Sequence, residues 1–384
     1  MRILIRKVFL ISAVCMILSP GTGFSYSSDK KQIMAILPFE NLAGHKSIDW
    51  ISEGIASSLI TKLAEVKDLI IVERYYVKKI LDEIKLKLTG ITEGAAIETG
   101  KLLSANIIVL GEFQYFDRNI KISMRVIDVN TGKIEGSGEV TGEMKDIFFL
   151  EDKLSQRILS LIGKSAEGIG QFKVSSVNTT SIKAYEEYST AKKVWDGKSA
   201  EPENIRMAVG HYRKALKHDP GFFLAAMELG DALGEIAEFD EALKWFKYAL
   251  KLGKKTIKDK NTVNYCKDKI YEKTSLTYLR KGKLKKAFST LKKAFKVHPS
   301  CFTSYRLLGR IFEKEGDMEK AVSAYRKAIE IKPYDPDGYY SLGAILLAKG
   351  EKAEARKAFL KSIETDHFGE FTKKAQIYLN RIPE

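Results

Sequence analysis

The sequence has few cysteines, and this scarcity excludes the small disulfide-stapled scaffolds. It contains three cysteines in 384 residues, whereas a disulfide framework would be far richer in them. Cys15 lies in a segment that we expect to be removed, which leaves Cys266 and Cys301 about one structural repeat apart. At that separation we expect two partly buried thiols, with a disulfide bridge as the alternative. Since we see no cluster of histidines beside them, the sequence predicts no metal site.

The sequence also lacks the motifs on which most catalytic sites are built. It has no nucleophile elbow, no His-Glu-x-x-His pair and no phosphate-binding loop. Of its five histidines, His218, His298 and His367 fall near the ends of predicted helices, where a cation is favoured. The sequence therefore predicts a protein that is not an enzyme, with no catalytic, cofactor-binding or metal-binding residues and no cofactor.

Long hydrophobic runs are scarce too, and the one that stands out lies at the start of the chain. Arg2 and Lys7 precede the apolar stretch 8–18, which is shorter than the ~20 residues that a membrane-spanning helix needs. Small residues then precede Tyr26, as they do at a signal-peptidase site. We predict a signal peptide over residues 1–25 that is cleaved on export, with an uncleaved anchor as the alternative.

Acidic residues are unevenly distributed, so the formal net charge of +15 is concentrated in one region. Residues 251–300 hold 16 lysines and arginines against 3 acidic residues, a net charge of +13. For an exported protein, the anionic partners that fit such a region are acidic proteins, envelope polymers and lipid headgroups. We do not expect nucleic acid as a partner outside the cytoplasm.

Residues 30–164 alternate between short apolar runs and amphipathic stretches. Residues 32–39 are predicted as a buried strand, and apolar residues at i, i+4 spacing across 51–66 mark a helix. Over 111–141, apolar and polar residues alternate with period two around an Asn-Thr-Gly turn, as in a hairpin. This order predicts an α/β domain in which a mixed sheet is covered by helices.

Four short motifs in this domain form a recognisable series. They are residues 35–41 (AILPFEN), 51–55 (ISEGI), 100–111 (GKLLSANIIVLG) and 125–132 (RVIDVNTG). In this order they resemble the CsgG/FlgO and TolB amino-terminal-like group of bacterial proteins. The resemblance implies a cell-envelope domain, located in the periplasm or on the periplasmic face of the outer membrane. It also implies a role in secretion or surface-structure assembly and a tendency to form homo-oligomers through this domain.

The same resemblance raises the question of a secretion channel. The curli secretion channels of this group add further hairpins that enter the outer membrane, and each strand that crosses a membrane takes about 9–11 residues with an apolar lipid face. The alternating pair over 111–141 is already needed to complete the domain's own sheet. We therefore expect no pore from this chain and keep a channel subunit as an alternative.

Residues 181–369 repeat a pattern with a period of about 34 residues. Small and aromatic residues return at fixed positions: Gly230, Ala242 and Phe246; Ser275, Ala287 and Leu291; Gly309, Ala321 and Tyr325; Gly343, Ala355 and Phe359. The pattern resembles tetratricopeptide (TPR) repeats, in which small residues let two helices cross closely. We predict an all-α TPR superhelix of five repeats over 181–369, the first one degenerate. A linker over 165–180 precedes it and a capping helix over 370–384 follows.

TPR arrays bind partners through the concave wall that is formed by the first helix of each pair. Arg306, Arg310 and Lys314 recur at i, i+4 and i+8 and therefore share one face of a helix. The neighbouring first helices add further candidates for the same wall, namely Lys269, Arg280 and Tyr340. This pattern predicts a groove for an acidic segment or a chain-terminal carboxylate, with a solvated cationic face as the alternative. The asparagines of the chaperone-type carboxylate clamp are missing here.

The sequence thus leads to three hypotheses about function. The first is a non-enzymatic exported adaptor of the cell envelope that binds a protein or peptide partner through its TPR groove, in secretion or surface-structure assembly. The second is a subunit of an outer-membrane transport or secretion channel. The third is a protein that binds an anionic wall polymer or lipid through its basic repeat.

Overall fold

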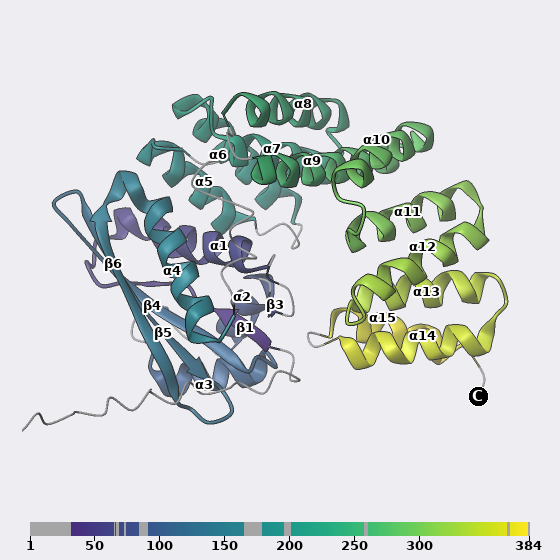
Figure 1. Ribbon diagram of the computed structural model, residues 1–384, viewed down its shortest axis with the longest axis horizontal. Helices are drawn as coiled ribbons and strands as arrows, with labels where there is room; N and C mark the ends of the chain where they lie inside the picture. Colours follow the sequence, from purple (N-terminus) through teal and green to yellow (C-terminus); the bar gives the residue numbers. More distant parts are fainter. Residues whose placement is uncertain are drawn as a thin grey trace, which may run out of the picture. The chain divides into compact units, whose positions relative to one another are not determined.

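The computed structural model shows an α/β part followed by a run of helices (Figure 1). It describes residues 32–64, 66, 69–72, 74–83, 91–164, 179–195, 201–256, 260–366 and 369–382. The predicted signal peptide over residues 1–25, nearly all of the predicted linker over 165–180, and His367 lie outside the described residues. Within the described ranges, no helix has the length and apolar character needed to cross a membrane.

A mixed sheet forms the centre of the first part. Its strands are β1 (Gln32–Ile36), β2 (Glu40–Asn41), β3 (Leu69–Ile71), β4 (Ile107–Phe116), β5 (Asn119–Asp128) and β6 (Ile134–Glu143). They lie in the order β3-β1-β4-β5-β6, and β2 also pairs with β4. β1 pairs in parallel with β3 and β4, whereas β4, β5 and β6 form an antiparallel meander. The predicted mixed sheet is confirmed, and the predicted hairpin forms its antiparallel half.

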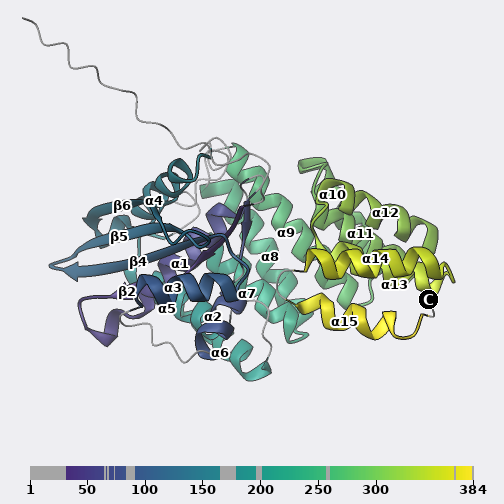
Figure 2. The ribbon, with the colours of Figure 1, turned by 90° about the horizontal axis from the view of Figure 1, so that it is seen from below.

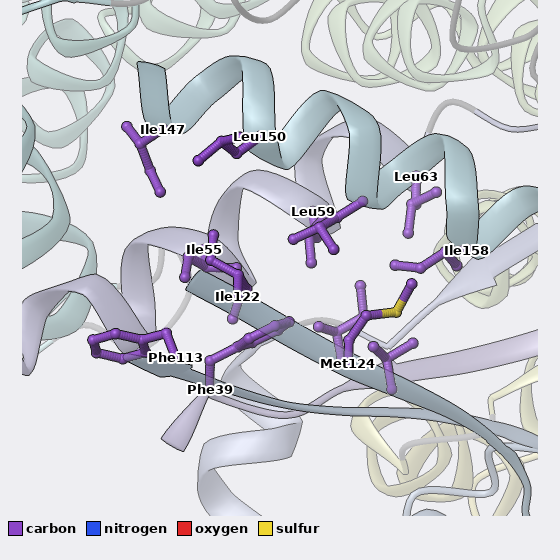
Figure 3. Packing of buried hydrophobic residues seen from close by; sticks show 14 of the residues in the cluster. Phe39, Ile55, Leu59, Leu63, Phe113, Ile122, Met124, Ile147, Leu150 and Ile158 are labelled. Atoms are coloured by element: carbon purple, nitrogen blue, oxygen red, sulfur yellow. The ribbon is translucent and has the colours of Figure 1, made fainter. Parts of the chain in front are cut away.

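Helices cover both faces of this sheet. They are α1 (Trp50–Leu63), α2 (Arg74–Glu83), α3 (Glu93–Leu102) and α4 (Ile147–Leu161). Because side chains alternate along a strand, Met34 and Ile36 of β1 join one apolar core with α1 and α4, while Ile33 and Ala35 join a second core with α2 and α3. Figure 3 shows the first core, where Leu59 of α1 and Leu150 and Ile158 of α4 lie over the sheet.

The second part consists of helical hairpins. They are α5 (Ile182–Val194) with α6 (Pro202–His218), α7 (Phe223–Glu235) with α8 (Phe239–Thr256), α9 (Lys260–Arg280) with α10 (Leu284–Val297), α11 (Phe302–Glu315) with α12 (Met318–Ile331), and α13 (Pro336–Ala348) with α14 (Lys352–Thr365). A further helix, α15 (Glu370–Leu379), lies beside α14 (Figure 2). The predicted all-α array of TPR type is confirmed.

The two helices of a hairpin cross where the first one carries a small residue. A Cβ atom on Gly309 of α11 would lie 2.6 Å from the ring of Tyr325 on α12. One repeat earlier Ser275 takes the glycine position, and its buried hydroxyl donates a hydrogen bond to a backbone carbonyl of α10. Close packing of two helices therefore explains why small residues return at fixed positions in the sequence.

The first helix of the repeats also belongs to the core of the α/β part. The ring of Tyr185 on α5 packs against Trp50 and Phe148, with ring centroids 5.4 and 4.6 Å apart. Gly54 of α1 allows this approach, because a Cβ atom there would lie 2.5 Å from the Tyr185 hydroxyl. The same helix places Ala184 in the core of the first hairpins. α5 is therefore shared between the two parts.

A buried charged network lies beneath α5. Glu151 of α4 is fully buried and accepts hydrogen bonds from the hydroxyls of Ser58 and Tyr185. The ammonium nitrogen of Lys62 lies 3.6 Å from the Glu151 carboxylate and 2.9 Å from that of Asp152. Burial nevertheless dominates and raises the pKa of Glu151 to about 7. This core therefore contains a carboxyl group that titrates close to neutral pH.

Candidate partner-binding surface

The six residues predicted to line a groove all lie on the first helices of consecutive hairpins. Lys269 and Arg280 are on α9, Arg306, Arg310 and Lys314 are on α11, and Tyr340 is on α13. We call the solvent-facing side of α9, α11 and α13 the first-helix surface. All six side chains thus belong to first helices, but they differ in their exposure to solvent and in the residues that they contact.

Arg306 is held by two carboxylates of the next hairpin. Its guanidinium nitrogen lies 2.9 Å from Asp335 and 3.1 Å from Asp337, and its side chain is 25% exposed. Asp335 also caps α13, because it accepts a hydrogen bond from the backbone nitrogen of Gly338. Arg306 therefore joins α11 to the start of α13, and its charge is already neutralised within the protein.

The basic residues of α9 have internal partners as well. The guanidinium of Arg280 lies 2.7 Å from the carboxylate of Glu235, at the end of α7. Lys273 of α9 forms an ion pair with Asp231, which is also on α7. Lys269 is 3.9 Å from Glu272, one turn away on α9. Ion pairs between successive first helices thus connect neighbouring repeats. The sequence did not reveal the pairs between α9 and α7, since their members are 42 and 45 residues apart.

Tyr340 takes part in packing. Its ring lies 5.9 Å from Phe359, 5.6 Å from Phe371 and 6.0 Å from Tyr378, measured between centroids. Desolvation by these neighbours raises the pKa of Tyr340 to about 12, with the neighbouring Tyr378 hydroxyl contributing. Tyr340 therefore belongs to the aromatic cluster that joins α13 and α14 to α15.

Arg310 and Lys314 are the predicted groove residues that face solvent with their charge available. Both are exposed, and within the described ranges neither makes an ion pair. They lie one turn apart on α11, so they share one face of that helix. The positive charge that the sequence assigns to the whole wall is thus confined, on α11, to this pair.

A second group of exposed cations lies on α10, the second helix of the hairpin that α9 begins. Its exposed lysines are Lys285, Lys286, Lys292, Lys293 and Lys296. The Lys292 ammonium lies 4.5 Å from the centre of the Phe288 ring, which is a cation–π distance. The helix contains no acidic residue. Of the net charge of +13 in region 251–300, five lysines are therefore displayed along α10, outside the predicted groove.

Hollows on the described surface are open and of mixed charge. One of about 600 Å³ runs along α11 and α12, and its lining includes Leu308, Phe312 and Val322 together with Lys320 and Arg326. Its lining thus combines apolar and charged side chains.

The family comparisons agree with this two-part architecture. Residues 25–123 match the model of the curli production assembly/transport component CsgG. Residues 203–255, 309–350 and 336–366 match models of the TPR or tetratricopeptide repeat. The curated proteins include no match to this chain. The predicted combination of a CsgG-like amino-terminal domain with TPR repeats is therefore confirmed.

Several solved structures are similar to parts of this chain. MamA from Desulfovibrio magneticus RS-1 is 18% identical, with 49% of this chain and 98% of that chain covered and a TM-score of 0.36. A thermophilic TPR protein of Thermus thermophilus is 19% identical, with 52% and 98% covered and a TM-score of 0.39. The LpoB C-terminal domain from Salmonella enterica is 15% identical, with 30% and 84% covered and a TM-score of 0.26.

Proposed function

We propose that this chain, a CsgG-like domain followed by TPR repeats, is a non-enzymatic adaptor of the cell envelope that binds a protein partner through its first-helix surface. The observation that carries this proposal is the array of five helical hairpins attached to a CsgG-like domain. A hairpin array offers an extended surface for a polypeptide, and the CsgG-like match supports an envelope setting. Secretion or surface-structure assembly is the process that this combination favours.

The surroundings of the predicted groove residues support a specific place for the partner. Arg306, Arg280 and Lys269 already have carboxylate partners, so they contribute shape and rigidity to the array. Arg310 and Lys314 face solvent, and an acidic segment of the partner can pair with them without displacing an internal carboxylate. The bound segment lies across α11 in this proposal, over the face of that helix that carries Arg310 and Lys314.

The remaining parts of the proposal concern location and assembly. The predicted signal peptide and the CsgG-like match favour export to the periplasm or to the periplasmic face of the outer membrane. The CsgG-like domain is the proposed site of homo-oligomerisation, and the repeats then project several copies of one binding surface. Several linked copies would raise the avidity for a repetitive partner without any new contact. A subunit of an outer-membrane transport channel is the alternative, and stable detergent-resistant rings of the purified protein would favour it.

A second candidate function, binding of an anionic wall polymer or lipid, is favoured by the exposed lysines of α10. That surface has high charge and little shape, so binding to it should be dominated by screened electrostatics. The Debye length is ~8 Å at physiological ionic strength. Retention on anionic vesicles that disappears between low and moderate salt would therefore favour this function, and retention that ignores salt would reject it.

The adaptor proposal predicts that partner binding depends on Arg310 and Lys314. The double change Arg310→Glu and Lys314→Glu should lower the affinity for the partner by at least tenfold, because two attractive contacts become repulsive. The measurement is equilibrium binding of the partner that co-purifies from the native envelope. The matched control is Lys357→Glu on α14, another exposed lysine on a second helix. Equal loss in the control, or no loss in the double variant, would refute the proposed surface.

A further inference from the structure

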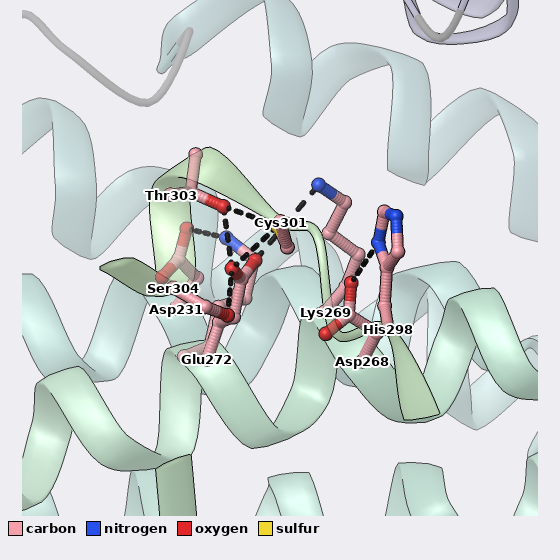
Figure 4. A network of polar contacts seen from close by, with 9 residues as sticks. Asp231, Asp268, Lys269, Glu272, His298, Cys301, Thr303 and Ser304 are labelled. Atoms are coloured by element: carbon pink, nitrogen blue, oxygen red, sulfur yellow. Dashed lines mark hydrogen bonds and ion pairs between the residues drawn. The ribbon is translucent and has the colours of Figure 1, made fainter. Parts of the chain in front are cut away.

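A cluster of metal-ligating side chains lies where α9 meets the junction of α10 and α11 (Figure 4). Asp268 comes from α9, His298 follows the last residue of α10, and Cys301 is the N-cap residue of α11. One ligand atom from each residue, a carboxylate oxygen, an imidazole nitrogen and a thiol sulfur, lies within 4.8 Å of the other two. The sequence predicted no metal site, because no cluster of histidines accompanies the two cysteines and this set contains a single histidine.

The separations within the cluster are close to those of a coordinated ion. Zinc sits at ~2.0–2.2 Å from nitrogen and oxygen ligands and at ~2.3 Å from thiolate sulfur, so tetrahedral ligands lie about 3.3–3.6 Å apart. The Nδ1 atom of His298 is 3.2 Å from the carboxylate of Asp268. The longest separation in the set is at most 4.8 Å. Small side-chain movements therefore suffice to bring all three atoms onto one ion.

The buried carboxylate of Asp268 is a second observation that points to a cation ligand. Asp268 is 1% exposed, and its Oδ1 atom is buried with no hydrogen-bond partner. A buried acceptor that is left unpaired destabilises the fold. A cation shared with His298 and Cys301 would satisfy this oxygen. The cluster therefore combines a suitable ligand set with a buried carboxylate oxygen that has no hydrogen-bond partner.

A second carboxylate lies next to the thiol. Glu272 is one turn after Asp268 on α9, so both project from one face of the helix. Its Oε1 atom is 3.2 Å from the Cys301 sulfur and also accepts hydrogen bonds from Thr303 and Ser304. A thiolate this close to a carboxylate is unfavourable unless a cation lies between them. Glu272 is thus the nearest candidate for a fourth ligand, and in any case it orients Cys301.

We propose that Asp268, His298 and Cys301 bind one Zn²⁺ ion, with Glu272 as the nearest further oxygen ligand. The donor set of one thiolate, one imidazole and one carboxylate suits zinc, whereas magnesium and calcium prefer oxygen ligands alone. His298 is 56% exposed in its side chain, which leaves the ion a path from solvent. The site is separate from the proposed partner-binding pair on α11, so it adds to the proposed function.

The ion would connect two neighbouring repeats. Its ligands come from the third hairpin, α9 with α10, and from the first turn of the fourth hairpin. Metal binding therefore would fix the angle between these hairpins and stabilise the folded array. Without metal, the same place is held by weaker links. His298 shares a hydrogen bond with Asp268, and Cys301 donates one to Glu272.

The test uses the reduced, purified full chain and Co²⁺ as a spectroscopic substitute for Zn²⁺. We expect one Co²⁺ per chain, with a thiolate-to-cobalt charge-transfer band that Zn²⁺ displaces stoichiometrically. Cys301→Ser should abolish the band, and His298→Gln should weaken Zn²⁺ binding at least tenfold in a chelator competition. Thermal melting should shift upward with added Zn²⁺ in the unchanged chain and not in these variants.

Two matched variants serve as controls. Cys266→Ala removes the other thiol of the described chain, and His218→Gln changes a histidine at the corresponding end of α6. Both should retain the Co²⁺ band and the Zn²⁺ affinity. The proposal is overturned if the unchanged chain binds no stoichiometric ion, or if the charge-transfer band persists in Cys301→Ser. Circular dichroism of each metal-free variant separates loss of the site from loss of the fold.

Discussion

At the scale of single residues, several charged side chains of the repeats form ion pairs with one another. Arg306 with Asp335 and Arg280 with Glu235 connect helices of different hairpins. Each such pair is partly exposed, so its net contribution to stability is modest. Each pair also fixes the position of one first helix relative to the next. A variant of Arg306 would therefore report on packing, and it is unsuited to a test of partner binding.

Glu151 provides a prediction about pH at this scale. Its pKa is raised from 4.5 to about 7 by burial, so the folded chain binds a proton that the unfolded chain releases between these two values. The free energy of unfolding should therefore fall as pH rises from about 4.5 to about 7, by up to about 3 kcal/mol. Glu151→Gln should remove this dependence, since glutamine resembles the protonated acid and Lys62 keeps Asp152 as a partner.

The measurement is urea unfolding between pH 4.5 and pH 7.5, followed by fluorescence. The matched control is Glu139→Gln on β6, where the carboxylate is exposed. That change should leave the slope of stability against pH as it is in the unchanged chain. An unaltered slope in Glu151→Gln would contradict the prediction, because it would mean that Glu151 is ionised in the folded protein across this range.

Gly309 provides a prediction about packing. Gly309→Ala would place a Cβ atom 2.6 Å from the Tyr325 ring, and the two helices of the hairpin would have to separate. We expect a loss of about 1–3 kcal/mol in the free energy of unfolding. Gly210→Ala on α6 is the control, since nothing lies within 4 Å of its added methyl group. It should stabilise the helix by about 0.5–1 kcal/mol, so the two substitutions should have opposite signs in thermal melts.

At the scale of elements, α5 is the helix whose role the sequence described least well. The sequence predicts a degenerate first repeat that starts at about residue 181, which makes α5 the first helix of that repeat. Nothing in that pattern indicates that Tyr185 enters the α/β core, because its neighbours Trp50 and Phe148 are far away in the sequence. Sequence periodicity identifies a buried face, but it does not say what covers that face.

The shared position of α5 leads to a prediction about coupling. Tyr185→Ala should destabilise the protein by about 3–5 kcal/mol through the cavity it leaves. Because α5 touches both parts, the loss should appear as faster amide hydrogen exchange in α1 and in α6 together. The control is Ile182→Ala on the same helix, where the side chain is 42% exposed and the change should stay within about 0.5 kcal/mol. Faster exchange in α6 alone would show that α5 is not shared.

At the scale of the whole molecule, the sequence predicts the architecture well and the sites poorly. The mixed sheet and the hairpin array follow from local periodicity, since β1 is a continuous apolar run and the small residue at Gly309 recurs one repeat length later. The partners of Arg306 and of Asp268 do not follow, because each lies about a repeat length away in the chain. Only the short spacing between His298 and Cys301 is local in the sequence, and one histidine beside one cysteine is a weak signal for a metal site.

Two surfaces of different chemistry remain available for partners in this architecture. One is the exposed pair Arg310 and Lys314 on α11, and the other is formed by the exposed lysines of α10. The first is a pair of cations beside first-helix residues that are already ion-paired and suits an acidic segment of a protein, whereas the second suits a polyanion without a defined shape. The adaptor account assigns the specific partner to the first surface, which is a claim about position that can be tested directly.

The most direct test is site-specific photo-crosslinking in intact cells of the native organism. A photoreactive amino acid at position 310 should give one dominant crosslinked protein, and the same amino acid at position 357 of α14 should not give it. Mass spectrometry then identifies the crosslinked protein and the segment that is attached. The account predicts an acidic segment of an envelope protein. Equal crosslinking from both positions, or none from position 310, would contradict it.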